Sequence, residues 1–217
     1  MAKRTGEKYE VIIEAAIRII ADNGYHGSQV SKIAKEAGVA EGTIYLYFEN
    51  KEDILISIFR NKLGEFISLA PQKIKDIENS YEQLAGLIYL HFYRLQNNPK
   101  LAHVLQIELR QSDKSIRKGI AEVIREYYAL IEGIVQNGIK KGYFRPDLDP
   151  KIARKVIFGS MDEVATCWVL SSRHYNLISL AGQVYSALAQ SLSRDGKYMD
   201  FPAQLKLGEE IAFNNIF

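Results

Sequence analysis

Residues 28–55 read SQVSKIAKEAGVAEGTIYLYFENKEDIL, and this stretch decides the fold. Its spacing predicts a helix over 30–37, a tight turn, a second short helix over 41–47 and the start of a third helix at Lys51. Apolar residues recur in the first helix at the three-and-four spacing of a single helical face. Gly38 ends that helix, because glycine readily takes the left-handed backbone conformation that closes a helix.

The second helix is too short to be stable alone, so Ile44 and Phe48 must anchor it while the rest of it faces outward. Its outward face is small, polar and aromatic: Gly42, Thr43, Tyr45 and Tyr47. Such a surface on a rigid support suits insertion into the major groove of DNA. The arrangement is a helix-turn-helix, although a similar two-helix corner also occurs in proteins that never meet DNA.

The pattern VSKIAKEAGVAEGTIYLYFENKEDIL resembles the DNA-binding signature of the TetR family of bacterial transcriptional regulators, over about the first sixty residues. Position by position, the resemblance implies two groups of DNA contacts. Backbone phosphates would be met by Ser28, Gln29 and Lys51, and the groove or its bases by Glu41, Gly42, Thr43, Tyr45 and Tyr47. From the local sequence alone, the Ser28 hydroxyl can also cap the helix that follows it.

Composition indicates a soluble globular protein, with 217 residues, 47% of them hydrophobic and 25% charged. No run of eighteen apolar residues occurs, and the N-terminal MAKRTGEKYE is polar. We therefore expect neither a membrane-spanning helix nor a signal peptide, and a cytoplasmic location. The single cysteine, Cys167, cannot form an internal disulfide, and its apolar neighbours predict a small core residue.

The net charge of +2 does not by itself predict nucleic-acid binding. Residues 1–51 contain seven lysines and arginines against seven acids, so their balance is zero. DNA binding would therefore depend on where the charges lie. One basic face could be formed by Lys3, Arg4, Lys8, Lys32 and Lys51.

Helical spacing continues along the chain, and no alternating run of β-branched residues competes with it. We predict an all-α fold with helices over 8–23, 51–70, 80–96, 99–110, 113–141, 150–172 and 174–193. Asn23-Gly24 ends the first of these and Pro71 the second. A DNA-binding domain over 1–50 would precede a ligand-binding and dimerisation domain over 51–217. The tail from 194, with a possible short helix over 202–212, either folds back on the core or stays mobile.

The helices after residue 70 have enough apolar surface to enclose a ligand, although the same side chains can equally pack on one another. Residues 106–119, QIELRQSDKSIRKG, cross a helix break and carry a basic cluster: Arg110, Lys114, Arg117 and Lys118. The cluster can bind phosphates while the bundle holds a hydrophobic tail, or it can be an ordinary solvated turn.

QIELRQS at 106–112 and VIFGSMDEVATCWVL at 156–170 resemble the FadR-type repressors of fatty acid degradation, a TetR branch that responds to long-chain acyl-CoA. The resemblance covers about residues 8 to 193 and implies a homodimer. Helices 150–172 and 174–193 would form a four-helix interface, and helices over 80–141 would enclose the acyl chain. The charged part of CoA would meet Arg110, Lys114 and Arg117, and the pocket lining would include Phe92, His103, Gln106, Ile107, Tyr128, Phe158 and Trp168.

The expected function is repression of fatty acid degradation genes at a palindromic operator in double-stranded DNA, relieved by long-chain acyl-CoA. A TetR-type regulator of another apolar compound, such as a drug, is the alternative within the family. An enzyme is disfavoured, because the four histidines have no partners at metal-ligand spacing and neither a glycine-rich phosphate loop nor a Gly-x-Ser-x-Gly motif occurs. We therefore expect no catalytic residues, no metal and no cofactor.

Overall fold

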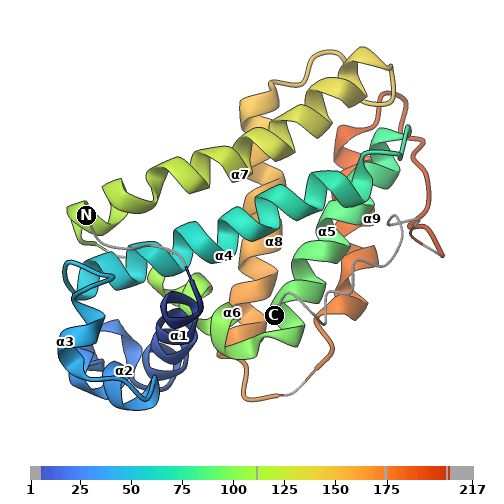
Figure 1. Cartoon of the computed structure of the whole chain (residues 1–217). Helices are drawn as coiled ribbons and strands as arrows, with labels where there is room; N and C mark the ends of the chain where they lie inside the picture. The colour runs from blue at the N-terminus through green and yellow to red at the C-terminus, as the bar shows by residue number, and fades with distance from the viewer. Residues whose placement is uncertain (1–5, 111, 174, 204, 206–217) are drawn as a thin grey trace. The chain divides into compact units, whose positions relative to one another are not determined.

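The computed structural model describes residues 6–110, 112–173, 175–203 and 205, and each regular element in these ranges is helical (Figure 1). The all-α prediction is confirmed. Lys3, Arg4 and most of the short helix expected over 202–212 lie outside the described residues. The helices are α1 Glu7–Gly27, α2 Val30–Glu36, α3 Glu41–Ile44, α4 Lys51–Ile74, α5 Ser80–Asn97, α6 Pro99–Glu108, α7 Lys114–Lys140, α8 Pro150–Leu170, the 3₁₀ turn η1 Ile178–Leu180 and α9 Ala181–Leu192.

The described residues fall into two compact units. Unit 1 draws on residues 1–65, 95–126 and 164–174, and unit 2 on 66–94, 127–163 and 175–217. Unit 1 therefore adds α6, the first part of α7 and the end of α8 to the helix-turn-helix. The division into domains at residue 50 stays a prediction. Over the described ranges, no helix combines the length and apolar character that a membrane span requires.

In unit 1, α1 is the helix on which the helix-turn-helix rests, and it packs against both α2 and α6. Its inner face, spaced three and four residues apart, is fully buried at Ile13, Ala16 and Ile20. The regular helix breaks at Gly24, whose φ of +69° lies in the left-handed region. The predicted break at Asn23-Gly24 is thereby confirmed.

A buried lysine joins α4 to α1. The Lys62 side chain is only 6% exposed, and its ammonium lies 2.8 Å from a Glu14 carboxylate oxygen and 3.9 Å from one of Glu10. Glu65, one turn further along α4, lies 3.6 Å from the same ammonium. Several carboxylates thus surround the cation, which a buried charge requires.

The end of α4 and the start of α9 differ from those predicted. Pro71 lies inside α4 rather than at its end, and one turn of helix follows it. The helix tolerates the proline there because its missing N–H costs only one hydrogen bond near the helix end, where Ala70 and Ile74 are buried. α9 begins at Ala181 instead of residue 174, after a buried Leu177 and a 3₁₀ turn.

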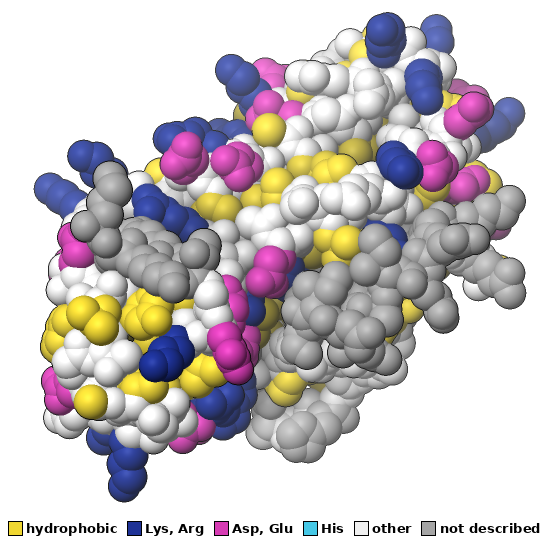
Figure 2. All heavy atoms as spheres, viewed as in Figure 1, with side chains coloured by type: hydrophobic (Ala, Val, Ile, Leu, Met, Phe, Trp, Pro, Cys, Tyr) yellow, Lys and Arg dark blue, Asp and Glu magenta, His cyan; other side chains and the backbone are white. Residues whose placement is uncertain are grey.

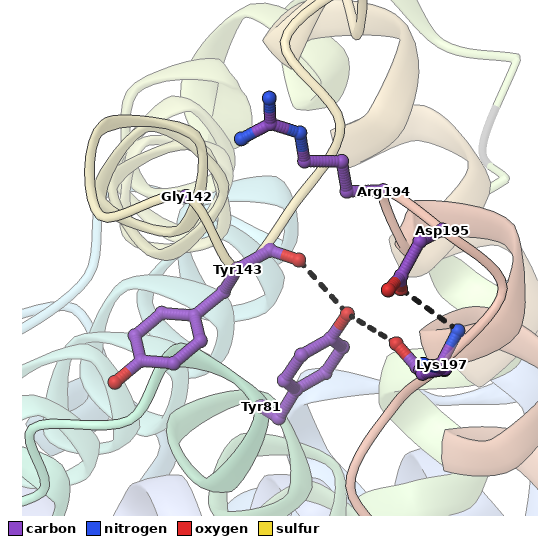
Figure 3. A pocket seen from close by; sticks show the side chains of 6 residues that line it. All are labelled: Tyr81, Gly142, Tyr143, Arg194, Asp195 and Lys197. Carbon is purple, nitrogen blue, oxygen red and sulfur yellow. Dashed lines mark hydrogen bonds between the residues drawn. The ribbon is translucent and has the colours of Figure 1, made fainter.

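The segment after α9 folds back on unit 2, which decides between the two alternatives for its described part. The Tyr81 hydroxyl donates to the backbone oxygen of Tyr143 at 2.9 Å and contacts that of Lys197 at 3.4 Å (Figure 3). Further along, the Tyr185 hydroxyl donates to the Met199 oxygen at 2.7 Å, and Phe201 packs edge-on against the Tyr185 ring. The buried side chains of Tyr81 and Tyr185 therefore supply hydrogen bonds to backbone oxygens of this segment.

Candidate functional sites

The helix-turn-helix is closed by backbone hydrogen bonds at Gly38. The N–H of Val39 donates to Ala34 at 3.0 Å and that of Gly38 to Lys35 at 3.2 Å, the paired bonds of a Schellman motif. Gly38 has a φ of +66°, as the sequence predicted. Ile33 and Ala34 bury the inner face of α2. The turn between α2 and α3 is consequently fixed by backbone geometry.

α3 is anchored by the two residues that the sequence singled out, since Ile44 and Phe48 are both fully buried. The Phe48 ring stacks on Tyr9 of α1 with centroids 5.2 Å apart. The helix itself is shorter than predicted and covers Glu41–Ile44 rather than 41–47. Residues 45–47 form turns whose hydrogen bonds return to Thr43 and Ile44.

The other side chains of α3 and of the turn after it form the outward surface. Glu41, Gly42 and Tyr45 are exposed, Tyr45 to 50%, whereas Thr43 and Tyr47 are half-buried. Leu46, which the sequence analysis did not include, is 66% exposed. It points outward because it lies in a turn, so helical periodicity could not have identified it. An apolar side chain beside two tyrosines can meet the methyl groups of thymine.

Ser28 does not act as the sequence predicted. Its side chain is buried, and its hydroxyl donates to the backbone oxygens of Gly24 at 2.7 Å and Ile19 at 3.2 Å. The hydroxyl thus binds two backbone oxygens of α1, one of them at the break itself. The residue that precedes α2 is Gln29, which is exposed. The predicted helix cap is therefore wrong, whereas the predicted phosphate contact of Ser28 stays a prediction.

Lys51 has a structural role at the start of α4. Its ammonium donates to the backbone oxygens of Tyr25 at 2.9 Å and Ser28 at 3.0 Å, and it lies 4.4 Å from the centre of the Tyr25 ring. The lysine therefore fixes the segment that joins α1 to α2. Its predicted phosphate contact stays a prediction, and in such a contact the ammonium would bind a phosphate as well as these backbone oxygens.

Charge around α1–α3 is mixed, as the sequence count indicated. Figure 2 shows basic, acidic and apolar side chains together on this part of the molecule. Lys8, Lys32 and Lys35 are exposed, whereas Arg18 is paired with Glu36. Placement of individual lysines, rather than a uniformly basic face, would provide the electrostatic attraction to DNA.

Part of the predicted effector site lies in unit 1, around α6. A surface pocket of about 380 Å³ is lined by Ile107, Glu108, Arg110 and Ser112 together with residues 23–27. Arg110 is exposed and donates to the Gln106 backbone oxygen at 2.6 Å. Among the other predicted residues in unit 1, Lys114 and Arg117 are exposed on α7, whereas His103 and Trp168 are half-buried. Gln106 is buried, and its side-chain oxygen accepts a hydrogen bond from the Thr166 hydroxyl at 2.9 Å.

The remaining predicted effector residues lie in unit 2. Phe92 is fully buried among core residues. Tyr128 meets Phe158 edge-on at 5.0 Å, and the Arg154 guanidinium lies 4.2 Å from the centre of the Tyr128 ring. Arg154 also pairs with Glu132 at 3.0 Å. Tyr128 and Phe158 are thus brought together, beside a cation that the sequence analysis did not assign to the site.

α8 presents an exposed apolar stripe. Ile152, Val156 and Leu170 are 55%, 50% and 65% exposed, and Cys167 lies on the same face. The prediction that Cys167 is a core residue is wrong for the isolated chain. Large apolar side chains at helical spacing on an exposed face are typical of a protein interface.

Comparisons with known proteins agree with this organisation. Residues 12–58 match the family described as bacterial regulatory proteins of the tetR family, and residues 59–191 match the C-terminal region of YsiA-like proteins. The chain is 47% identical over 190 residues to the fatty acid metabolism regulator protein of Bacillus subtilis strain 168, covering 88% of this chain and 98% of the relative.

Two solved structures are similar over nearly their whole lengths. The crystal structure of FadR from Bacillus subtilis in complex with stearoyl-CoA has a TM-score of 0.81 and 46% identity, covering 88% of this chain and 100% of that one. FadR from Bacillus halodurans has a TM-score of 0.83 and 46% identity, covering 86% and 97%. The chain therefore belongs to the TetR family of bacterial regulatory proteins, which regulate transcription rather than catalyse reactions.

Proposed function

We propose that this chain is a repressor of fatty acid degradation genes that long-chain acyl-CoA releases from operator DNA. The observation that carries the proposal is the 47% identity to a fatty acid metabolism regulator through 98% of that relative's length. A similar structure holds stearoyl-CoA, which indicates the class of effector. Because the protein would act on bacterial DNA, its place of action is the cytoplasm.

The helix-turn-helix supports operator binding. Gly42 and Tyr45 are exposed on α3, and Ile44 and Phe48 hold that surface rigid. A homodimer formed through the exposed stripe of α8, together with α9, would carry two such surfaces. A palindromic operator with half-sites about one helical turn, roughly 34 Å, apart would match this two-fold symmetry.

The basic residues just after α6 and at the start of α7 support recognition of the charged part of CoA. Arg110 lines the pocket beside residues 23–27, and Lys114 and Arg117 are exposed at the start of α7. Guanidinium groups bind phosphate through paired hydrogen bonds, which suits the pyrophosphate and 3′-phosphate of CoA. The acyl chain would be held among apolar residues, for which Tyr128 and Phe158 remain candidates.

Release of DNA requires that the effector bind one conformation of the protein more tightly than the other. The conformation with acyl-CoA would hold the two reading surfaces at a spacing that does not fit the operator. Tight binding to both conformations alike would leave the operator occupied. The proposal therefore predicts that operator DNA and acyl-CoA weaken each other's binding by the same factor.

The test selects fragments of the organism's own genomic DNA on the purified protein, with and without stearoyl-CoA. Fragments upstream of fatty acid degradation genes should be enriched, and stearoyl-CoA but not free CoA should abolish the enrichment. The double variant Arg110→Ala, Arg117→Ala should keep operator binding and lose this response. Enrichment that stearoyl-CoA leaves unchanged in the unsubstituted protein would refute the proposal in favour of another apolar effector.

A further inference from the structure

A buried hydrogen bond joins the end of α6 to the segment that leads into the helix-turn-helix. Glu108, the last residue of α6, is only 5% exposed, and its carboxylate accepts the backbone N–H of Tyr25 at 3.0 Å. The two residues are 83 positions apart in the sequence. The bond is therefore a tertiary connection between two elements of unit 1, not part of a local turn.

Tyr25 is held on its other side by α4. Its backbone oxygen accepts from the Lys51 ammonium at 2.9 Å, and its ring lies under the same ammonium at 4.4 Å. Ser28, three residues further on, fixes the break in α1 through its buried hydroxyl. Glu108 is thus the α6 component of a set of contacts that determine where the chain enters α2.

Glu108 also lies next to the residues proposed to sense the effector. Gln106 and Ile107 precede it on α6, and Arg110 follows it. The pocket of about 380 Å³ is lined both by this end of α6 and by residues 23–27. A ligand that engages Arg110 would therefore act on the end of α6 that holds the Tyr25 N–H.

Loss of the Glu108 carboxylate would leave the backbone N–H of Tyr25 without its acceptor. A hydrogen bond to a carboxylate is stronger than one between neutral groups, and a buried N–H without an acceptor is unfavourable. Tyr25 is the first residue of the turn at residues 25–28, which leads into α2. No side chain caps the start of α2. Displacement of Glu108 would free this turn and allow α2 and α3 to reorient.

We propose that Glu108 is a positioning residue through which acyl-CoA binding controls the orientation of the reading surface, and this rests on the proposed function. The bond from the Tyr25 N–H to the Glu108 carboxylate holds α2 and α3 in the orientation that fits the operator. The effector lowers operator affinity by displacing that carboxylate.

The test compares Glu108→Leu, which removes the acceptor, with Glu108→Gln, which keeps an acceptor oxygen at similar reach. Operator Kd is measured with and without saturating stearoyl-CoA, and stearoyl-CoA Kd is measured on free and operator-bound protein. In Glu108→Leu, operator Kd without effector should rise at least about fivefold, and the further effect of stearoyl-CoA should shrink at least about fivefold. Glu108→Gln should stay within about twofold of the unsubstituted protein in both respects.

A merely structural role would lower the melting temperature and leave the ratio of the two operator Kd values unchanged, and that result would overturn the proposal. If Glu108→Leu does not fold, Glu108→Asp, whose carboxylate is withdrawn by one methylene, should show the same reduction in smaller degree; an unchanged ratio there also overturns it. If stearoyl-CoA fails to release the unsubstituted protein from its operator, the proposed function fails as well. If the unsubstituted protein is released and stearoyl-CoA raises the operator Kd of Glu108→Leu by the same factor, only the role of Glu108 is refuted.

Discussion

His91 should make the protein sensitive to acid. Its ring lies in unit 2 against Phe66 and Tyr127, and its Nδ1 is hydrogen-bonded to the Tyr127 hydroxyl at 2.9 Å. Burial lowers the pKa of His91 to about 4, and the positive charge of Arg94 acts in the same direction. Within the described residues, the buried Nε2 has no hydrogen-bond partner, so protonation there would create a buried cation.

The magnitude follows from the difference between the folded and unfolded pKa values. An unfolded histidine has a pKa of about 6.5, so from pH 6.5 down to about 4 the unfolded chain gains a proton that the native His91 does not. Proton uptake by the unfolded state stabilises it, and native stability therefore falls across this window as pH falls. The full loss is on the order of 3 kcal/mol, and at pH 4.5 it is about 2.5 kcal/mol.

The assay is urea unfolding at pH 7.0 and 4.5, with protomer concentration held constant because a dimer's stability depends on it. His91→Gln cannot titrate, so its loss of unfolding free energy between the two pH values should be smaller than that of the unsubstituted protein by about 2.5 kcal/mol. His26→Gln, at an exposed histidine, is the matched control and should keep the original loss. Equal losses in the unsubstituted protein and His91→Gln would refute the burial of a neutral imidazole.

Three further predictions concern α7, the reading surface and the segment after α9. In Gly138→Ala the added Cβ would collide with the buried Phe144 ring, so the free energy of unfolding measured with urea should fall by about 1–3 kcal/mol. Gly133→Ala in the same helix has open space around its Cβ, so its free energy of unfolding should rise by up to about 1 kcal/mol. Equal effects of the two alanines would contradict the packing of α7. Tyr45→Ala should weaken operator binding by about 1–3 kcal/mol in a gel-shift titration with an unchanged melting temperature, and unaltered affinity would exclude Tyr45 from the interface. Phe201→Ala should lower the unfolding free energy by about 1–2 kcal/mol, less than for a fully buried phenylalanine; no loss would show that the segment after α9 is not bound in solution.

Local chemistry made several features predictable from the sequence. Gly24 and Gly38 interrupt helices because their backbone conformations disfavour other residues, and such a preference is visible in one residue and its neighbours. Ile44 and Phe48 could be assigned as anchors because a short helix between polar residues offers few other apolar positions. The helix-turn-helix could therefore be predicted from residues 28–55 alone.

Features that depend on distant residues were not predictable. Ser28 resembles a helix cap in its local sequence, but its hydroxyl binds the backbone oxygens of Ile19 and Gly24 in the preceding helix. Lys51 resembles a phosphate ligand, and the structure shows it bound to two backbone oxygens of another segment. The bond from Tyr25 to Glu108 spans 83 residues and leaves no periodic signal in the sequence. Cys167 has apolar neighbours, yet it is exposed on α8, a helix that the family resemblance places in a dimer interface.

Fluorescence anisotropy of a labelled operator, titrated with stearoyl-CoA in the presence of just enough protein to saturate the DNA, tests the central claim most directly. Our account predicts that anisotropy falls to the value of free DNA, that operator Kd rises at least tenfold, and that coenzyme A without an acyl chain has no such effect. Anisotropy that stays at the bound value after stearoyl-CoA has saturated the protein would contradict it.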